Sequence, residues 1–444
     1  MTDFLLERMQ EFGEQIAVGE AHGETSYSAL IQRMDEWRGR VRAAGIAPGQ
    51  VVSLEGEYGA DVIAAFLALW ENDNIVVPLT DAALANHDTF REIAGVEVRI
   101  LLGSEDGTVT TTEAEQSKHE LYEIVRARGA AGLVLFTSGS TGASKAVVHD
   151  LDQLLEKYRK QRQQLRTIVF LQLDHIGGVN TLFYTLANGG AVIVPGSRTA
   201  QDVCIAIERF SAQLLPTSPT FLNLLLLSGE HKKRDLSSLD LITYGTEPMP
   251  KSTLMRTYEA FPDVRLQQTY GSTELGILGS RSKSNSSLWV RVGGGGFETK
   301  VVDGTLRVKS PTAMLGYMNA PSPFDDDGFV DTGDRVEVDG DWIRILGRES
   351  EIINVGGSKV HPSEVESVLL DMEEVADASV RGEPHPILGH VVAATVELAE
   401  PMSGGDLKKA VRRFCKDLLP GYAIPLIINQ SSEPLYSSRF KRRR

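Results

Sequence analysis

The chain has 444 residues, of which 42% are hydrophobic and 24% charged, as in ordinary globular proteins. Its 45 basic and 60 acidic residues give a formal net charge of −15, which argues against a general nucleic-acid-binding protein because phosphate backbones require a net basic face. The longest uninterrupted apolar run, 62–70, is far shorter than the roughly 18 residues of a membrane-spanning helix. The first residues lack a signal-peptide pattern, so we expect a cytoplasmic protein without membrane insertion.

Short apolar runs alternate with amphipathic segments up to about residue 269. We expect strands at 51–54, 75–79, 132–136, 146–149, 167–173, 191–195, 213–216, 241–244 and 265–269, and helices at 61–70 and near 151–164, 179–188, 201–210 and 219–228. Repeated strand–helix alternation is typical of parallel sheets covered by helices. The sequence therefore predicts an α/β fold with a large N-terminal domain.

The pattern changes after about residue 290. A run of four glycines at 293–296 precedes short strand-like pieces with Asp-Gly turns at 303–304, 327–328 and 339–340, which indicate hairpins. From 348 onward strands mix with expected helices near 362–371 and 404–418. We therefore expect a β-rich subdomain at about 290–347 and a small α+β domain at 348–444.

A loop rich in Ser, Thr and Gly connects the expected strands 132–136 and 146–149. Its candidate ligand-binding residues are Thr137, Ser138, Gly139, Ser140, Thr141, Gly142 and Lys145. Such a loop offers hydroxyl and backbone N–H donors with little steric bulk, so phosphate oxygens can approach closely, and Lys145 adds positive charge. A flexible linker has a similar composition. A linker is not expected between two strands of buried type, so the loop predicts a phosphate site.

Three later segments carry groups suited to a nucleotide. Glu274 can bind Mg²⁺ and the hydroxyl of Thr273 can contact a phosphate oxygen, although a Thr-Glu pair is also common at a helix start. Asp334 follows a glycine turn, so its carboxylate can accept hydrogen bonds from two vicinal hydroxyls; a plain turn aspartate is the alternative. Gly356 and Gly357 allow a ligand to approach the backbone, or form an ordinary β-turn.

The loop at 137–145 resembles the phosphate-binding loop of the adenylate-forming superfamily, which includes acyl-CoA synthetases, adenylation domains and luciferases. The other motifs follow in the order of that family, from about residue 25 to residue 444. The resemblance implies an AMP-binding domain at 1–347 and a small mobile C-terminal domain at 348–444. It also implies ATP and Mg²⁺ as cofactors.

The family resemblance assigns roles to the segment 269–274. Glu274 matches the Mg²⁺ ligand of the family, and Thr273 matches the residue that contacts the α-phosphate. Tyr270 matches the residue that packs on adenine, and Gly271 lies next to the expected acid substrate. In the family the motif of Asp334 binds the ribose, with Arg348 assisting.

The same resemblance places the C-terminal segments at two stages of a reaction. The segment of Gly356 and Gly357 is expected to turn toward the active site after a domain rotation and to line the acceptor channel. Lys441 matches a catalytic lysine that usually follows a glycine, whereas here Phe440 precedes it. A basic, frayed tail is the alternative, since five of the last six residues are Arg or Lys.

The expected carboxylate pocket is built from two more segments. His175 resembles a family histidine that gates the carboxylate, which excludes an α-amino acid as substrate unless the neighbouring Asp174 takes that place. The segment 244–248 resembles the adenine-flanking turn, and Tyr244 there is expected to narrow the acyl tunnel in favour of a compact acid. The candidate cofactor-binding residues of this turn are Gly245, Thr246 and Glu247.

The resemblance thus implies a ligase that activates a small or medium carboxylic acid as an acyl-adenylate with release of pyrophosphate. CoA is the commonest acceptor in the family, and an amine in an amide-forming enzyme similar to coronafacate ligase is an alternative. Loading of a carrier protein in trans is a third possibility, and a non-catalytic nucleotide-binding protein is a fourth.

Overall fold

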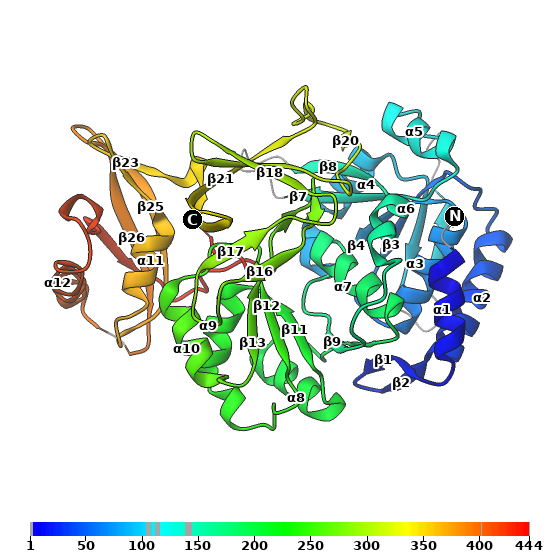
Figure 1. The fold of residues 1–444 in the computed structure, drawn as a ribbon, viewed down its shortest axis with the longest axis horizontal. Coiled ribbons are helices and arrows are strands. Elements are labelled where there is room, and N and C mark those ends of the chain that lie inside the picture. Colours follow the sequence, from blue (N-terminus) through cyan, green and yellow to red (C-terminus); the bar gives the residue numbers. More distant parts are fainter. Residues whose placement is uncertain (1–2, 104–107, 112–115, 138–143, 401, 444) are drawn as a thin grey trace.

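The computed structural model describes residues 3–103, 108–111, 116–137, 144–400 and 402–443. It has the expected mixed α/β fold, with two seven-stranded sheets, a six-stranded antiparallel sheet and a five-stranded C-terminal sheet. Figure 1 shows the N-terminal helices at one end of the elongated molecule and the C-terminal sheet at the other end. No helix in the described part of the chain is long and apolar enough to span a membrane.

The first seven-stranded sheet runs in the order β13-β12-β11-β9-β10-β1-β2 and is parallel except for β2. Its N-terminal strand β1 pairs with β10, so two segments far apart in sequence close the sheet. The strands are β1 Ile16–Glu20, β2 Gly23–Ser26, β9 Arg166–Ile168, β10 Ala191–Ile193, β11 Leu214–Thr217, β12 Leu241–Tyr244 and β13 Arg265–Gln268.

The second seven-stranded sheet has the order β20-β8-β7-β4-β3-β5-β6. Its strands are β3 Val51–Glu55, β4 Ile75–Leu79, β5 Val98–Leu101, β6 Thr108–Thr111, β7 Gly132–Thr137, β8 Lys145–Asp150 and β20 Gly316–Tyr317. β3, β4, β5 and β7 are parallel and read as continuous apolar runs, as expected for strands covered on both faces. β7 and β8 pair antiparallel and bring Thr137 opposite Lys145.

Helices cover these sheets on both sides. They are α1 Asp3–Phe12, α2 Tyr27–Ala43, α3 Ala60–Glu71, α4 His87–Ala94, α5 Glu120–Arg128, α6 Leu151–Leu155, α7 Ile176–Ala187, α8 Ala200–Phe210, α9 Pro219–Ser228 and α10 Lys251–Ala260, with short 3₁₀ turns at Asp81–Asn86, Glu156–Tyr158 and Glu230–Lys232. One large core gathers apolar side chains of α1, α2, α3 and α7, and a second packs α8, α9 and α10 against the first sheet. The first sheet is therefore packed on both faces, against α7 on one face and against α8, α9 and α10 on the other.

Two antiparallel sheets follow. The two-stranded one pairs β14 Gly271–Ser272 with β15 Gly276–Ile277. The six-stranded one contains β16 Ser280–Ser282, β17 Trp289–Val292, β18 Glu298–Val302, β19 Thr305–Lys309, β21 Val330–Asp339 and β22 Trp342–Arg348. The β-rich character expected from the Asp-Gly turns is therefore present, and β21 and β22 bring Asp334 opposite Arg348.

The segment after Arg348 forms its own sheet and core. Its strands are β23 Ile353–Val355, β24 Ser358–Val360, β25 Val375–His385, β26 Gly389–Leu398 and β27 Ile427–Gln430, and its helices are α11 Pro362–Leu369 and α12 Gly404–Cys415, with 3₁₀ turns at Glu349–Glu351 and Gly421–Ala423. The last residues leave this sheet and return to the first one, where Phe440 packs against the second core.

One expected helix is much shorter than the sequence pattern indicated. The helix expected near 151–164 consists of α6 and a single 3₁₀ turn that ends at Tyr158. Residues 159–164 contain only Arg, Lys and Gln, so a helix there would have no apolar face to bury. The chain is instead held by local polar contacts, such as that between the Gln164 side chain and the carbonyl of Gly189, 2.6 Å apart.

Candidate active site

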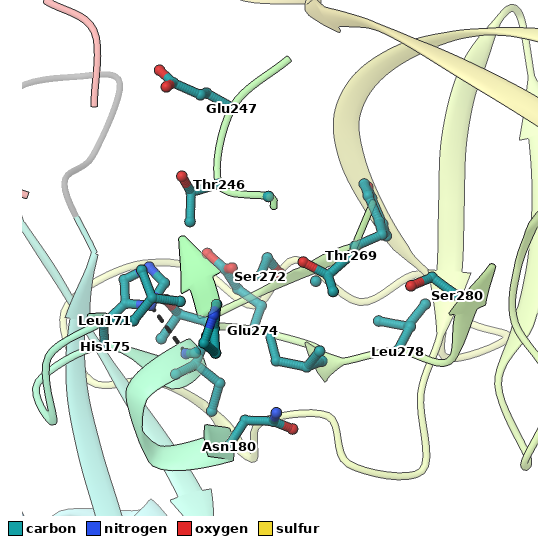
Figure 2. A pocket seen from close by; sticks show the side chains of 18 of the residues that line it. Leu171, His175, Asn180, Thr246, Glu247, Thr269, Ser272, Glu274, Leu278 and Ser280 are labelled. Carbon is teal, nitrogen blue, oxygen red and sulfur yellow. Dashed lines mark hydrogen bonds between the residues drawn. The ribbon is translucent and has the colours of Figure 1, made fainter. Parts of the chain in front are cut away.

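A cleft of about 1830 Å³ lies where the carboxyl ends of β11, β12 and β13 meet the antiparallel sheets and the C-terminal tail, residues 431–443. Thr217 ends β11, and Gly245 and Thr269 directly follow β12 and β13. Loops at the carboxyl ends of parallel strands are free to bind ligands because the sheet itself provides the rigid support. In Figure 2 Thr246 and Glu247 lie at one end of the cleft, and Asn180 lies at the other, beyond His175 and Glu274.

The residues expected to bind phosphate lie only partly in the described structure. Thr137 and Lys145 flank the loop and line the cleft. Ser138, Gly139, Ser140, Thr141 and Gly142 lie outside the described residues. The Lys145 ammonium lies 4.9 Å from the centre of the Tyr317 ring, and this cation–π contact holds the ammonium beside the ring.

Glu274 lines the cleft and is held by a tyrosine that the sequence analysis missed. The hydroxyl of Tyr317 donates to Glu274 Oε1 over 2.7 Å. Burial and the Glu274 carboxylate raise the pKa of Tyr317, so it remains a donor at neutral pH. One carboxylate with a second oxygen available suits Mg²⁺, which commonly uses one or two protein carboxylates together with substrate phosphates. No larger His, Cys, Asp and Glu cluster suited to a metal occurs among the described residues.

Tyr270 and Asp334 form the second polar pair. Tyr270 Oη donates to Asp334 Oδ2 over 2.7 Å, and Arg348 Nε lies 3.7 Å from Asp334 Oδ1. Burial raises the pKa of Asp334, whereas the Tyr270 hydroxyl and the Arg348 charge lower it. The Tyr270 hydroxyl thus directs the carboxylate that is expected to bind ribose, a contact that the sequence did not predict. Both residues and Arg348 line the cleft, as expected.

Thr273 and Gly271 also line the cleft. The backbone carbonyl of Thr273 is 2.7 Å from His149 Nε2, and burial lowers the pKa of His149 to about 4, so this histidine is a neutral donor. A Cβ atom at Gly271 would lie 2.4 Å from the carbonyl oxygen of Gly276. Glycine is therefore required at 271 for β14 and β15 to approach each other.

His175 caps the N-terminus of α7 at the cleft. Its Nδ1 accepts from the backbone N–H of Gly177 over 3.0 Å, the contact drawn in Figure 2. Burial and the nearby charges of Lys441 and Arg439 hold the pKa of His175 well below its usual value. A neutral ring that accepts at Nδ1 carries its proton at Nε2, so Nε2 can donate to a carboxylate.

Asp174 does not line the cleft, although its neighbour His175 does. Its Oδ2 lies 2.8 Å from Nη2 of Arg439 in an ion pair in which the Asp174 side chain is 5% exposed. Of the two alternatives left open by the sequence, the histidine faces the cleft and the aspartate binds Arg439. A Cβ at Gly178 would lie 1.9 Å from the carbonyl oxygen of Gln172, so the glycine lets this loop pack against α7.

The adenine-flanking turn agrees with the expectation only in part. Gly245, Thr246 and Glu247 line the cleft, and Thr246 has a positive φ of 74°. Glu247 accepts from the Thr220 backbone N–H over 2.8 Å and from the backbone N–H of Arg442 over 3.1 Å, so it fastens the tail. Tyr244 is buried in the core on the other face of β12, whereas Thr243 faces the cleft. The prediction that Tyr244 narrows the acyl tunnel is therefore wrong, because strand residues alternate between faces.

The tail carries Lys441 into the cleft. The preceding Phe440 has a φ of 51°, in the left-handed region that favours glycine. Its ring packs against Phe170, Phe221 and Tyr436, at centroid distances of 5.1, 5.7 and 5.4 Å. Ser218 Oγ donates to the carbonyl of Phe440 over 2.9 Å. An aromatic anchor thus replaces the flexibility of the usual glycine, and the tail is not frayed.

Lys441 lies among charges of both signs. Burial lowers the pKa of Lys441, the charges of Arg348 and Arg439 lower it further, and Glu247 and Glu274 oppose them. The next residue, Arg442, is paired with the C-terminal sheet through Asp377 at 2.9 Å and Glu366 at 3.4 Å. The tail therefore connects the C-terminal sheet to the cleft.

Gly356 and Gly357 are not brought to the cleft in this structure. They form the tight turn between β23 and β24, with φ values of 57° and 91°, and Gly356 N–H donates to the carbonyl of Leu388 over 2.9 Å. A role at the active site requires a different position of the C-terminal sheet, as the expected rotation implies.

Two family descriptions cover most of the chain: "AMP-binding enzyme" matches residues 5–318, and "AMP-binding enzyme C-terminal domain" matches residues 364–432. The chain belongs to the AMP-binding enzyme family. The resemblance to the adenylate-forming superfamily is thereby confirmed, and the protein is an AMP-forming ligase.

Individual relatives agree with this family. The chain is 25% identical to 2-succinylbenzoate–CoA ligase of Bacillus subtilis over 95% of its own length and 92% of that protein. Its fold is similar to that of o-succinylbenzoate CoA synthetase from Bacillus subtilis in complex with an acyl-adenylate, with a TM-score of 0.79, 22% identity and coverage of 100% and 97%. A structure of that synthetase with ATP and magnesium gives a TM-score of 0.78 at 22% identity, with coverage of 99% and 98%. The amide bond synthetase McbA from Marinactinospora thermotolerans gives a TM-score of 0.77 at 22% identity, with coverage of 99% and 97%.

Proposed function

We propose that this enzyme activates a carboxylic acid other than an α-amino acid as an acyl-adenylate, with release of pyrophosphate, and transfers the acyl group to CoA. The observation that carries the proposal is the position of Lys441, which shares one cleft with Glu274, Asp334 and His175. These residues come from four separate parts of the chain, and each supplies a group that the adenylation step needs. A protein that only binds nucleotides has no need of a lysine fixed in this position.

The first half-reaction follows from charge. A carboxylate oxygen of the acid attacks the α-phosphorus of ATP, and the bond between that phosphorus and the pyrophosphate oxygen breaks. Negative charge concentrates on the phosphate oxygens in the transition state, where the Lys441 ammonium and the Thr273 hydroxyl can offset it. His175 Nε2–H orients the attacking carboxylate. Asp334 holds the ribose hydroxyls, directed by Tyr270.

Glu274 is the residue that would hold Mg²⁺ in this reaction. Its Oε1 is engaged by Tyr317, which orients the carboxylate and leaves the second oxygen for the metal. Mg²⁺ bound there with the phosphates would lower the repulsion between the incoming carboxylate and ATP. ATP and Mg²⁺ as cofactors also agree with the similar structure that contains both.

Two observations concern the acid. Asp174, the residue that could pair with an α-ammonium group, is occupied by Arg439, and the neutral His175 faces the cleft instead. An acid without an α-amino group fits this arrangement. The sequence argument for a compact ring or branched acid rested on Tyr244, which lies in the core, so the size of the acid is set by other residues.

CoA is the proposed acceptor because the relative similar over 95% of the chain is a CoA ligase. An amine acceptor is the second candidate, favoured by the similar fold of an amide bond synthetase over 99% of the chain. A carrier protein acting in trans would use the same adenylate. For each acceptor, the turn of Gly356 and Gly357 would line the channel after rotation of the C-terminal sheet.

Exchange of labelled pyrophosphate into ATP, measured over a broad panel of carboxylic acids, tests the adenylation step. Acid-dependent exchange is expected for at least one class of acid. No exchange with any acid would refute the proposal. Mass spectrometry of the products formed with CoA or with free amino acids then identifies the acceptor, and an amide as the sole product would replace CoA by an amine.

A further inference from the structure

The cleft continues beyond His175 as a channel between α7 and the first sheet. Gly177, Thr181 and Tyr184 line it from one face of α7, at the i, i+4 and i+7 spacing of a single helix stripe. The opposite wall is formed by alternate residues of three neighbouring strands: Leu214 and Pro216, Leu241 and Thr243, and Arg265 and Gln267. The channel therefore runs along the strands, from their carboxyl ends at the nucleotide site toward their amino ends.

Charged residues are distributed unevenly along this channel. The nucleotide end is lined by charges of both signs: the carboxylates Glu247, Glu274, Asp331, Asp334, Glu349 and Glu351, and the cations Lys145, Arg348, Arg439, Lys441 and Arg442. The far end is lined by Lys157, Lys160, Arg162 and Arg265, and among the described lining residues no Asp or Glu lies there. Lys160, Arg162 and Arg265 are exposed, whereas Lys157 is only partly exposed, so Lys157 is the cation best placed to bind a negatively charged group inside the channel.

Lys157 is the most informative of these cations. Its Nζ donates to Asn180 Oδ1 over 2.6 Å and to the carbonyl of Ile277 over 3.3 Å, and both partners are neutral. Within the part of the chain that the structure describes, no carboxylate lies within ion-pair distance of this Nζ. Burial, and then the charge of Arg162, lower the pKa of Lys157 to about 7. An ammonium group placed in this way destabilises the protein unless a ligand supplies the missing negative charge.

The hydrogen bonds of Lys157 are not needed to hold its neighbours. Tyr158 Oη donates to Asn180 Oδ1 over 2.8 Å and to the Asn180 carbonyl over 3.1 Å, so Asn180 keeps a partner without the lysine. Lys157 also borders the channel itself. Its Nζ also lies 5.1 Å from the centre of the Tyr158 ring, so each partner of this charge in the described part of the chain is a neutral group and none is a carboxylate.

We propose that the acid substrate carries a second anionic group, a carboxylate in the simplest case, and that Lys157 binds this group while the first carboxylate lies at His175. The inference rests on the proposed adenylation function and specifies its substrate class. Asn180, the partner of Lys157, is five residues beyond His175 on α7, a rise of roughly 7–8 Å at 1.5 Å per residue. The two anionic groups are therefore separated by a short chain or a ring, and Arg162 and Arg265 extend the positive potential for longer substrates.

The test compares matched acids in the pyrophosphate-exchange assay. Straight-chain acids of graded length are each paired with the dicarboxylic acid of the same length, and phenylalkanoic acids are paired with analogues that carry a ring carboxylate. The dianionic member of the best pair is expected to have a kcat/KM about 10–100-fold above its partner, the range of a hydrogen bond to a charged group. In Lys157→Met this ratio should fall at least about tenfold, and in Lys157→Arg it should largely survive.

Two further measurements separate a substrate-binding role from a structural one. Lys408 is an exposed lysine on α12, and Lys408→Met is the matched control. This variant should leave the ratio of kcat/KM for the dianionic acid to that for its partner as in the unaltered protein. The melting temperature of Lys157→Met without ligand should be equal or higher, because an uncompensated ammonium is removed. A melting temperature well below that of the unaltered protein would assign Lys157 a structural role and overturn the inference.

The outcomes distinguish this inference from the proposed function. Exchange with single-charged acids and no preference for any dianionic acid would overturn the inference alone. A preference that persists in Lys157→Met would overturn the assignment to Lys157. Absence of exchange with every acid would refute the adenylation function, and this inference with it.

Discussion

Nη2 of Arg439 lies 2.8 Å from Oδ2 of Asp174, so the residue next to His175 is bound to the residue two positions before Lys441. The pair is largely buried, with exposed fractions of 23% and 5%. His175 and Lys441 are thus held near each other by residues close to them in the chain. No sequence motif could reveal this contact, because 265 positions separate its two residues.

Asp174→Asn should weaken this contact and slow adenylation. An amide leaves the arginine charge partly buried without a full partner, which costs on the order of 2–3 kcal/mol and releases the tail for part of the time. We expect a roughly tenfold lower rate of pyrophosphate exchange. Reaction of a pre-made adenylate with the acceptor is the control and should change little. Equal losses in both half-reactions would contradict a role in placing the tail.

Phe440 offers a test of backbone conformation against packing. Phe440→Ala removes the contacts with Phe170 and Phe221 and leaves a non-glycine residue at φ 51°. Phe440→Gly removes the same contacts and also relieves the left-handed conformation, worth roughly 1 kcal/mol. The glycine variant should therefore exchange pyrophosphate faster than the alanine variant. The reverse order would show that the positive φ is not maintained in solution.

Lys441→Ala should lower the rate of adenylation by about 10²–10³, the usual loss for one group that stabilises transition-state charge. The second half-reaction, started from a pre-made adenylate, should survive. Single-turnover measurements of the two steps check this difference. If both steps lose the same factor, Lys441 has a general structural role.

Glu274→Gln should raise the Mg²⁺ concentration needed for half-maximal exchange, because an amide is a much weaker ligand than a carboxylate. Tyr317→Phe removes only the hydrogen bond that orients Glu274, so a smaller shift in the same direction is expected. Titration of exchange against free Mg²⁺ at saturating ATP measures both shifts. An unaltered Mg²⁺ dependence in Glu274→Gln would exclude this residue as the metal ligand.

The buried His149 predicts a pH dependence of stability. Its pKa falls from 6.5 to about 4 on folding because burial disfavours the charged ring. Above pH 6.5 the His149 ring is neutral in both the folded and the unfolded state. Between pH 6.5 and 4 the unfolded chain binds a proton that the folded chain does not, so the free energy of unfolding falls as the pH is lowered. The loss reaches about 3 kcal/mol below pH 4. Denaturant titrations of the protein and of His149→Gln should converge as the pH is lowered through this window; parallel curves would contradict it.

The sequence predicted the fold class, and the candidate residues that line the cleft stand in short local motifs. Glu274, Asp334 and Lys441 each stand in a short pattern, and the structure places all three at the same cleft. The sequence could not predict that Tyr317 binds Glu274, because 43 positions separate the two residues and a Gly-Tyr pair carries no chemical signal. Tyr244 was assigned to the wrong face of β12, an error of one position that reverses the direction of a strand side chain.

The pairing of β1 with β10 has a consequence for synthesis on the ribosome. β1 can pair at once with β2, but Val18 has its other partner in Val192, so this hairpin cannot join the rest of the sheet until β10 has emerged. At roughly 5–20 residues per second, that interval lasts on the order of ten seconds or more. During it the residues of β1 remain without their neighbours on β10, and a chaperone that binds this segment of the nascent chain would act in this interval.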